Sequence, residues 1–456
     1  MKKVISILLS VVLLASFFVF NSSAKSDYVI RSPYEDVKWG ETKAWKGNLH
    51  THSFASDADV DYTDMIIEHY KQGFDFLAMT DHGVTGTAWN EKPVELPLYT
   101  YQKIIGNKTH YFSDEEFAAL QNGTYPVDGV ARGYGMTCVK GGNELNALTI
   151  TKCHVNGIFL PPDVGNNHLG YENNHECAVK LVDEVPGAYS FINHPGDWLH
   201  ANKDRSVYSD PANVKYFSDI ILKYDSCLGM EVFNEKNSVT PADAILWDNL
   251  LMTCLPYGKN VIAFSNSDVH SLDLVDSSYS IFMMEENTEE SIKEAMAKGS
   301  FFCVTRNLPA NEKFGPAEGF NVRNTDLPVP EFTELSVDGH TVTVKVKNCY
   351  DIKWIANGNV IAAKAITQSA DETTYTIDLD SINGAEDFLY IRCQLLGEGG
   401  ETLSQALTID NGTKPLEYKE DTSAGAKIST ILYRIKSLRL FVIIQLLADL
   451  IKDKIF

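Results

Sequence analysis

The stretch that decides the fold reads Gly47-Asn48-Leu49-His50-Thr51-His52, and it is followed closely by Ser56-Asp57. We expect a strand that begins near Trp45 to carry both histidines. Side chains two residues apart in a strand lie on the same face, so His50 and His52 would form a metal clamp. A His-x-His pair alone is a weak signal, because two histidines fall this close together by chance. Its meaning depends on the residues that follow it.

Short apolar strands alternate with helices after this stretch, which is typical of a parallel α/β unit. Residues 63–73 are predicted to form a helix that Thr63 caps and Gly73 ends. Residues 74–79 are apolar enough for a strand buried on both faces. Later strands are predicted at residues 136–139, 153–160, 188–192, 229–234, 261–264, 279–284 and 301–305, and later helices at residues 175–184, 213–222, 241–255 and 288–298. The sequence therefore predicts an α/β barrel over residues 40–306, with an insertion at residues 84–135.

A second domain is expected after the barrel, because 456 residues are too many for one ordinary core. Residues 307–330 are Pro-rich and indicate a linker. Alternating strands separated by Gly-containing turns then predict a small β-sandwich at residues 331–415. We expect it to pack on the barrel; contact with a carbohydrate or with the cell surface is the alternative.

The two ends of the chain predict export and contact with a membrane. Residues 1–24 have the basic start, apolar core and small-residue end of a secretory signal, although an uncleaved membrane anchor is the alternative. Either one would place the catalytic part outside the cytoplasm, as a secreted, periplasmic or surface-attached protein. Residues 428–456 mix apolar and basic residues. They predict an amphipathic helix lying on a membrane surface, or else a helix packed on the protein or on a second copy.

Charge and cysteine content narrow the possible partners and cross-links. The formal net charge of −22 argues against a nucleic acid partner, because a phosphate backbone requires a basic face. Export permits disulfides, and Cys349 and Cys393 could face each other across strands. Four other cysteines stand alone in apolar runs, where a buried free thiol is the common state: Cys138, Cys153, Cys254 and Cys303.

Polar residues gather at the ends of the predicted strands. These residues are His50, His52, Asp57, His82, Glu144, His154, His194, Asp268 and His270. In a parallel α/β barrel the loops after the strands face one mouth, so these side chains could converge. Imidazole and carboxylate are ligands of zinc, manganese and iron, and this number could hold two or three such divalent ions. A histidine at a strand end is commonly an ordinary hydrogen-bonding group, but nine such residues in order argue against coincidence.

The ordered motifs resemble the PHP (polymerase and histidinol phosphatase) metallohydrolases. The resemblance covers residues 45–306 and rests on the stretch quoted first, Ser56-Asp57, Thr80-Asp81-His82-Gly83, Gly142-Asn143-Glu144, Asn193-His194-Pro195 and Ser267-Asp268-Val269-His270. It implies a distorted (β/α)7 barrel with a trinuclear metal site. An exported barrel followed by a β-sandwich is also similar to the carbaryl-hydrolase-like branch, as are residues 229–234 and 299–305.

The same resemblance distributes the ligands over three ions. It implies that one ion is held by His50, His52, Glu144 and Asp268. Glu144 would bridge to a second ion, which His154 and His194 also hold. Asp57, His82 and His270 would hold the third. Asp59 and Asp61 lie close enough in sequence to replace Asp57, which we prefer because a serine precedes it.

The expected activity is hydrolysis of a phosphomonoester or phosphodiester of a small molecule. Clustered divalent ions lower the pKa of water between them and polarise the bond that it attacks. Arg306 is the candidate cation for the phosphoryl group, with a surface salt bridge as the alternative. His168, His175 and His200 could serve as a leaving-group acid, but are more simply surface histidines. Carboxylester or carbamate hydrolysis at the same ions is the enzyme alternative, and a non-catalytic surface binding protein is the other; a true amidohydrolase fits the motifs less well.

Overall fold

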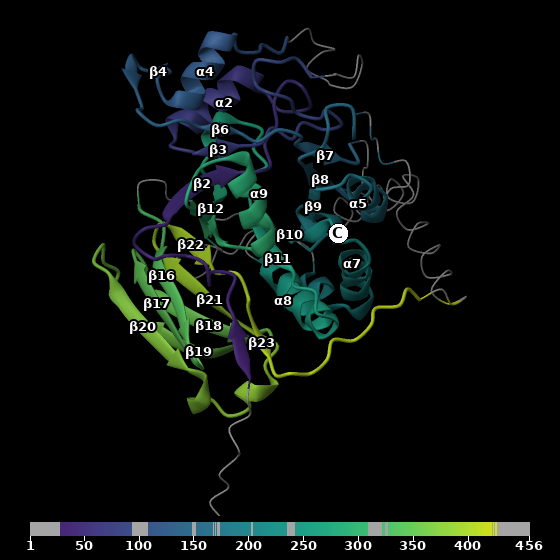
Figure 1. The fold of residues 1–456 in the computed structure, drawn as a ribbon, viewed down its shortest axis with the longest axis vertical. Helices are drawn as coiled ribbons and strands as arrows, with labels where there is room; N and C mark the ends of the chain where they lie inside the picture. Colours follow the sequence, from purple (N-terminus) through teal and green to yellow (C-terminus); the bar gives the residue numbers. More distant parts are fainter. Residues whose placement is uncertain are drawn as a thin grey trace, which may run out of the picture.

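The computed structural model describes residues 28–93, 108–147, 152–166, 168, 170, 174–201, 204–234, 242–308, 322–323, 327–421, 423 and 425. The predicted signal segment and the predicted C-terminal helix lie outside these ranges, as do parts of the insertion and the linker. The described chain is a mixed α/β protein with two units: in Figure 1 the first fills the top and the right of the picture, and the second lies at the lower left. Within these ranges, no helix combines the length and the apolar character needed to cross a bilayer.

The first sheet begins in the site-bearing unit. Strands β2 (Lys43–Asn48), β3 (Phe76–Leu77) and β6 (Thr137–Cys138) pair in parallel. Strand β12 (Ser278–Met284) pairs antiparallel with β2 on one side and with β13 (Phe301–Thr305) on the other. Helix α2 (Tyr62–Lys71) precedes β3 and buries Met65, Ile66 and Tyr70. Its cap is Asp61, one residue before the helix, and not the predicted Thr63.

The second sheet has the order β11-β10-β9-β8-β7. Strands β9 (Tyr189–Ile192), β10 (Cys227–Phe233) and β11 (Ile262–Ser265) are parallel, and every residue of β10 and β11 is buried. Strands β7 (Asn143–Leu145) and β8 (Val155–Ile158) are antiparallel to their neighbours. The prediction of one closed (β/α)7 barrel is therefore not confirmed, because the described strands pair as two separate sheets.

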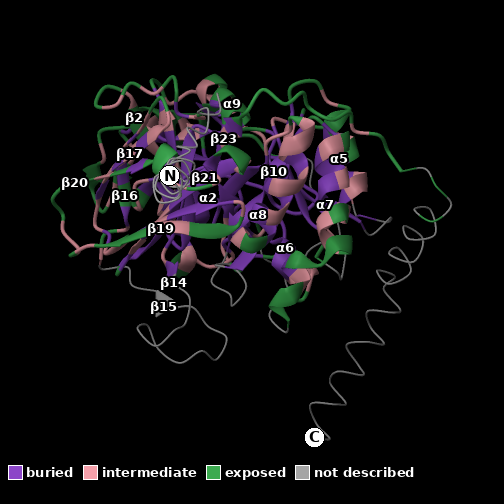
Figure 2. Ribbon diagram, turned by 90° about the horizontal axis from the view of Figure 1, so that it is seen from below, coloured by how far each residue is buried: buried purple, intermediate pink, exposed green. Residues whose placement is uncertain are grey.

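Helices cover the outer sides of the sheets, as the alternating pattern predicted. Helices α5 (His175–Asp183), α7 (Pro211–Lys223) and α8 (Asp243–Cys254) pack on β8, β9 and β10. Helix α9 (Glu289–Lys298) packs on β12, with Thr288 as its cap and Gly299 in the left-handed region at its end. In Figure 2 the strands between the helices are buried, whereas exposed residues lie on the outer faces of the helices.

The insertion and the loops add short elements. The insertion contains helix α4 (Asp114–Asn122), which begins with a capping box of Ser113 and Glu116. It also contains a hairpin of β4 (Pro126–Val127) and β5 (Val130–Ala131). A four-residue helix, α6 (Pro195–Trp198), follows β9 directly. Strands β14 (Asn307–Leu308) and β15 (Val322–Arg323) pair with each other within the predicted linker.

The second unit is a sandwich of two sheets. One is β16 (Glu331–Asp338), β17 (Thr341–Lys347) and β20 (Thr373–Asp378), and alternate residues of β17 are buried. The other contains β18 (Asp351–Ala356), β19 (Asn359–Ala365), β21 (Tyr390–Gly397), β22 (Gly400–Leu403), β23 (Leu407–Asp410) and, from the start of the chain, β1 (Val29–Arg31). All eight cysteines are free thiols, Cys349 and Cys393 included.

One continuous sheet joins the two units. Strand β22 of the sandwich pairs antiparallel with β13, so the first sheet runs from β6 through β2 and β13 into the sandwich. A buried ion pair adds a second connection. The Arg392 guanidinium on β21 donates to both carboxylate oxygens of Asp248 on α8, at 2.8 and 2.7 Å, and the Tyr390 hydroxyl donates to the same carboxylate at 2.6 Å.

A buried carboxyl on β22 makes stability depend on pH. Burial raises the pKa of Glu401 from 4.5 to about 7, although nearby Arg392 opposes the shift. The folded state therefore holds a proton that the unfolded state releases between these values, and stability falls as pH rises through this window. We expect Glu401→Gln to remove about 3 kcal/mol of this fall. Urea unfolding of both proteins between pH 4.5 and 7.5 measures it; parallel profiles would contradict the expectation.

Candidate metal centre

The histidine clamp lies where the two sheets meet. Strand β2 ends at Asn48, so His50 and His52 follow the strand and do not belong to it. The segment after β11 holds them instead, because the Asp268 N–H donates to the His50 carbonyl at 3.1 Å and the His52 N–H donates to the Val269 carbonyl at 3.2 Å. Thr51 and Val269 form an isolated parallel bridge. The clamp is thus positioned by both sheets together.

A second junction places Glu144 against the clamp. The Glu144 N–H donates to the Thr80 carbonyl at 3.0 Å, which connects β7 of the second sheet to the segment after β3 of the first.

Two ligand candidates also have strained backbone: φ is 46° at Asp268 and 26° at His194, values that residues with a side chain rarely adopt. Such strain persists where the surrounding structure demands it, and it is common at functional sites.

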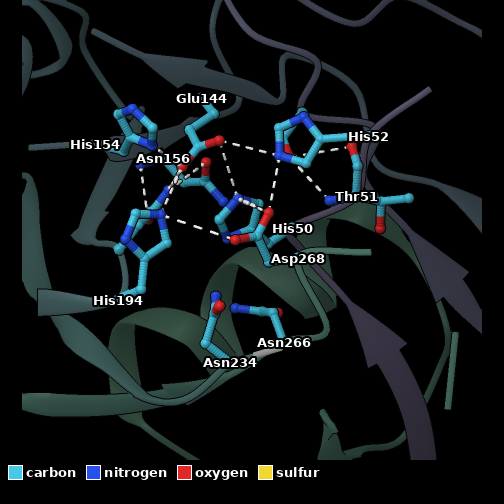
Figure 3. A network of polar contacts seen from close by, with 12 residues as sticks. His50, Thr51, His52, Glu144, His154, Asn156, His194, Asn234, Asn266 and Asp268 are labelled. Carbon is cyan, nitrogen blue, oxygen red and sulfur yellow. Dashed lines mark hydrogen bonds and ion pairs between the residues drawn. The ribbon is translucent and has the colours of Figure 1, made fainter. Parts of the chain in front are cut away.

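Four buried ligand atoms surround one point. His50 Nε2 lies 3.2 Å from Glu144 Oε2 and 3.1 Å from Asp268 Oδ1, and His52 Nε2 lies 3.0 and 3.1 Å from the same two oxygens. A tetrahedral zinc site with bonds of about 2.0–2.1 Å has ligand atoms about 3.3 Å apart. His50 Nε2, His52 Nε2 and Asp268 Oδ1 are buried without a hydrogen-bond partner. The donor set therefore fits a divalent ion (Figure 3).

Glu144 connects this group to three more histidines. Its Oε1 lies 3.0 Å from His154 Nδ1 and 3.2 Å from His194 Nε2. Its Oε2 lies 3.3 Å from His82 Nε2. His82, Glu144 and His154 form a second group that could hold an ion. One carboxylate is thus shared between neighbouring groups, as a bridging ligand would be.

The remaining predicted ligands gather around Asp57. Its carboxylate lies 3.3 Å from His270 Nε2 and 3.6 Å from both His82 Nε2 and His52 Nδ1. His52, Asp57 and His82 form the third group that could hold an ion, but the Asp57 side chain is 52% exposed. All nine predicted ligands thus contact at least one other member of the set. The assignment of each ligand to a particular ion stays a prediction.

Charges of both signs balance inside the cluster. Burial opposes the charged form of His50 and His52, but Asp268 and Glu144 outweigh it and hold the pKa of both histidines well above the ordinary value. Burial would raise the pKa of Glu144, yet the imidazoles of His50 and His154 hold it well below its usual range. Burial lowers the pKa of His82 to about 4. Since bound metal must displace protons from these imidazoles, metal affinity is expected to weaken in acid.

A buried glutamate that sequence reasoning missed supports the clamp. Glu231 lies on β10, and its Oε1 is 2.9 Å from His50 Nδ1. Its Oε2 accepts a hydrogen bond from the His194 backbone N–H at 3.1 Å. The side-chain amides of Asn234 and Asn266 donate to the two oxygens at 2.7 and 3.0 Å. A carboxylate behind a ligating histidine fixes its tautomer and ring orientation. One feature of the sequence could have identified Glu231, because it is the acidic residue in a strand that is otherwise apolar.

His52 has its own support. The Ser56 hydroxyl lies 3.1 Å from His52 Nδ1 and donates to Asp81 at 2.7 Å. Asp81 also accepts the N–H and the hydroxyl of Ser53 at 2.7 and 2.8 Å. Asp81 belongs to the predicted Thr-Asp-His motif, and its hydrogen bonds to Ser53 and Ser56 fix the loop that follows His52.

Loss of the Glu231 charge is expected to weaken metal binding. Glu231→Gln keeps the shape of the side chain but no longer favours the His50 tautomer with a bare Nε2. We expect the metal dissociation constant to rise about 10- to 100-fold, in line with other residues that support metal ligands. Competition with a chromophoric chelator measures it, and Glu115→Gln on the exposed face of α4 is the control. Equal affinities for Glu231→Gln and wild type would contradict the expected role.

Other candidates from the sequence lie outside the cluster or have different partners. Arg306 Nε lies 2.6 Å from Asp276 Oδ2, and Nη1 donates to the Leu327 carbonyl at 2.8 Å. The predicted alternative was a surface salt bridge, whereas this salt bridge is largely buried, with both side chains at most 13% exposed. Any contact between Arg306 and substrate stays a prediction. Asp61 caps α2 and pairs with His110. The three candidate leaving-group acids differ in exposure. His175 is buried against the Tyr216 hydroxyl, His168 is half-buried and His200 is exposed.

Comparison with known proteins finds several similar solved structures. No protein-family model and no curated protein matches the chain. A two-domain protein from Bacteroides vulgatus ATCC 8482, described as containing a predicted PHP-like metal-dependent phosphoesterase, is 17% identical over 81% of this chain and 96% of its own, with a TM-score of 0.42. PsfC from Pseudomonas syringae PB-5123 is 12% identical over 53% of this chain and 83% of its own, with a TM-score of 0.32.

The third is the lesion-specific endonuclease PfuEndoQ from Pyrococcus furiosus, 16% identical over 56% of either chain, with a TM-score of 0.30. All three TM-scores are below 0.5, so these similarities establish neither family nor function. The assignment has to come from the residues of the cluster.

Proposed function

We propose that this chain is a metal-dependent hydrolase of the PHP type that cleaves a phosphoester of a small molecule. The observation that carries the proposal is the group of His50, His52, Glu144 and Asp268. Their ligand atoms lie within 3.2 Å of a neighbour, and three of the four are buried without a hydrogen-bond partner. These atoms face only the opposite charges of the cluster, and a bound divalent ion would take the place of the protons that those ion pairs require.

The protein's own groups would arrange the reaction. The nine side chains would hold two or three divalent ions, either zinc, manganese or iron. When bound, such ions activate water and stabilise charge that develops on the ester oxygens. Glu231 and Ser56 orient the two histidines of the clamp from behind. Asp57, half exposed at the edge of the cluster, marks the side on which solvent and substrate reach the site.

Two alternatives remain open to experiment. Carboxylester or carbamate hydrolysis would use the same cluster and would accord with the carbaryl-hydrolase-like branch. A non-catalytic binding protein would have no use for nine mutually contacting ligand residues. Export, and contact between residues 428–456 and a membrane, are further parts of this proposal and follow from the sequence alone.

Metal analysis followed by a comparison of substrates tests the proposal. The purified protein is analysed for bound zinc, manganese and iron by mass spectrometry, and is then assayed on a phosphomonoester, a phosphodiester and a carboxylester. We expect at least two ions per chain and the highest kcat/KM on a phosphoester. A protein that binds none of these ions when they are supplied would refute the metal centre. Carboxylester turnover without phosphoester turnover would favour the alternative hydrolase.

A further inference from the structure

An ion pair connects the segment before His154 to the short helix α6 after His194, and these two histidines face Glu144 Oε1. Lys152 lies two residues before His154, and Asp197 lies three residues after His194. Lys152 Nζ is 2.6 Å from Asp197 Oδ2. Two residues span at most about 7 Å of chain, so the backbone of Lys152 lies beside the ligand cluster. The pair lies at the outer edge of the cluster, because the Lys152 side chain is 54% exposed.

The backbone at Lys152 is strained in the same way as at two of the ligands. Its φ is 54°, in the left-handed region that residues with a side chain rarely adopt. Strain of this kind is unfavourable and persists where the surrounding structure demands it. This backbone conformation sets the direction of the Lys152 Cα–Cβ bond at the point where the chain enters the cluster.

Two other cations of the same unit have partners elsewhere: Lys46 lies on β2, and Arg306 directly follows β13. Lys46 Nζ and Arg306 Nε both contact Asp276, at 2.5 and 2.6 Å, and all three side chains are at most 17% exposed. Separating a buried pair leaves an uncompensated charge and is costly. The Lys152 side chain is 54% exposed and that of Asp197 is 19% exposed, so solvent screens this pair more than the two pairs of Asp276, and Lys152 can exchange partners at a lower cost.

We propose that Lys152 binds an anionic oxygen of the substrate beside the metal centre, exchanging Asp197 for that oxygen. It would thereby select phosphoesters over neutral esters. This inference rests on the proposed function and names the residue that gives that function its substrate class. An ammonium group forms strong charge-assisted hydrogen bonds with a phosphoryl oxygen, whereas a neutral ester offers it no negative charge.

Binding of inorganic phosphate to the metal-loaded protein tests the proposal without requiring turnover. Isothermal titration calorimetry compares wild type, Lys152→Ala and Lys152→Arg. Lys215→Ala is the matched control, because Lys215 is 56% exposed and pairs with Asp219 at 2.5 Å on the outer face of α7. Metal content is measured for every variant. Kinetics on a phosphodiester and on p-nitrophenyl acetate follow, so that an anionic and a neutral ester are compared.

The expected result is about a tenfold weaker phosphate affinity for Lys152→Ala, with full metal content. Lys152→Arg should retain most of the affinity, and Lys215→Ala should match wild type. KM should rise for the phosphodiester and stay unchanged for the acetate. Phosphate affinity within twofold of wild type in Lys152→Ala would overturn the proposal. If the chain binds no metal, the proposed function fails, and phosphate binding to the metal-free proteins still decides the part of Lys152.

Discussion

Replacement of Glu144 by glutamine is expected to remove metal ions and to lower kcat/KM by about a thousandfold or more, equivalent to about 4 kcal/mol of transition-state stabilisation. The two oxygens of this one carboxylate lie within 3.3 Å of five imidazoles, namely those of His50, His52, His82, His154 and His194. Glutamine has nearly the same shape, but it carries no charge and turns an NH₂ group toward ring nitrogens that must bind metal.

Two measurements separate loss of metal from loss of fold in Glu144→Gln. Mass spectrometry gives the number of ions per chain, and circular dichroism reports the fold. Glu115→Gln, on the exposed face of α4, should keep both its ions and its rate. A Glu144→Gln protein with the full number of ions and wild-type turnover would show that this carboxylate does not bridge metal ions.

Replacement of Asp248 by alanine is expected to lower the free energy of unfolding by about 3–5 kcal/mol. Asp248 accepts from Arg392 and Tyr390, and the Arg392 side chain is only 5% exposed. Without Asp248 the guanidinium would be buried as an unpaired charge between the two units. Urea unfolding measures the change. Asp219→Ala removes a surface ion pair with Lys215 and should cost less than about 1 kcal/mol.

A double variant distinguishes an unpaired charge from a simple cavity. In Asp248→Ala with Arg392→Met, no buried charge is left behind, so part of the lost stability should return. If the double variant is no more stable than Asp248→Ala alone, the loss comes from packing and not from the stranded guanidinium.

Local elements were predicted well because they depend on short-range patterns. The helices α5, α7, α8 and α9 begin and end within three residues of their predicted ranges where the structure describes them. Pairing direction was predicted poorly. Strands β7 and β8 are antiparallel because fewer than a dozen residues connect them, too few for a helical crossover. The loss of the closed barrel follows from such long-range choices, which periodicity does not report.

The cluster was predictable because most of its ligands stand in short motifs close to a strand, although Glu144 lies within β7 and His154 directly precedes β8. Glu231 was missed because its partner, His50, is 181 positions away in sequence, and nothing near Glu231 indicates the contact. Arg306 was chosen for its place after a strand, but its guanidinium is bonded to Asp276. A motif identifies a side chain's chemical type, whereas its partners depend on the packing of distant segments.

The junction of the two sheets gives the ligands a mechanical part as well. Among the described strands, the sheets meet at the clamp through an isolated bridge and a few single hydrogen bonds, not through a continuous ladder. Ions held by His50 and His52 from one side and by Asp268 from the other would cross-link the two sheets at this junction. Without the ions, this junction should open locally more often. Its backbone amides should then exchange with solvent faster than those inside either sheet. Resistance to unfolding and metal occupancy would then rise and fall together.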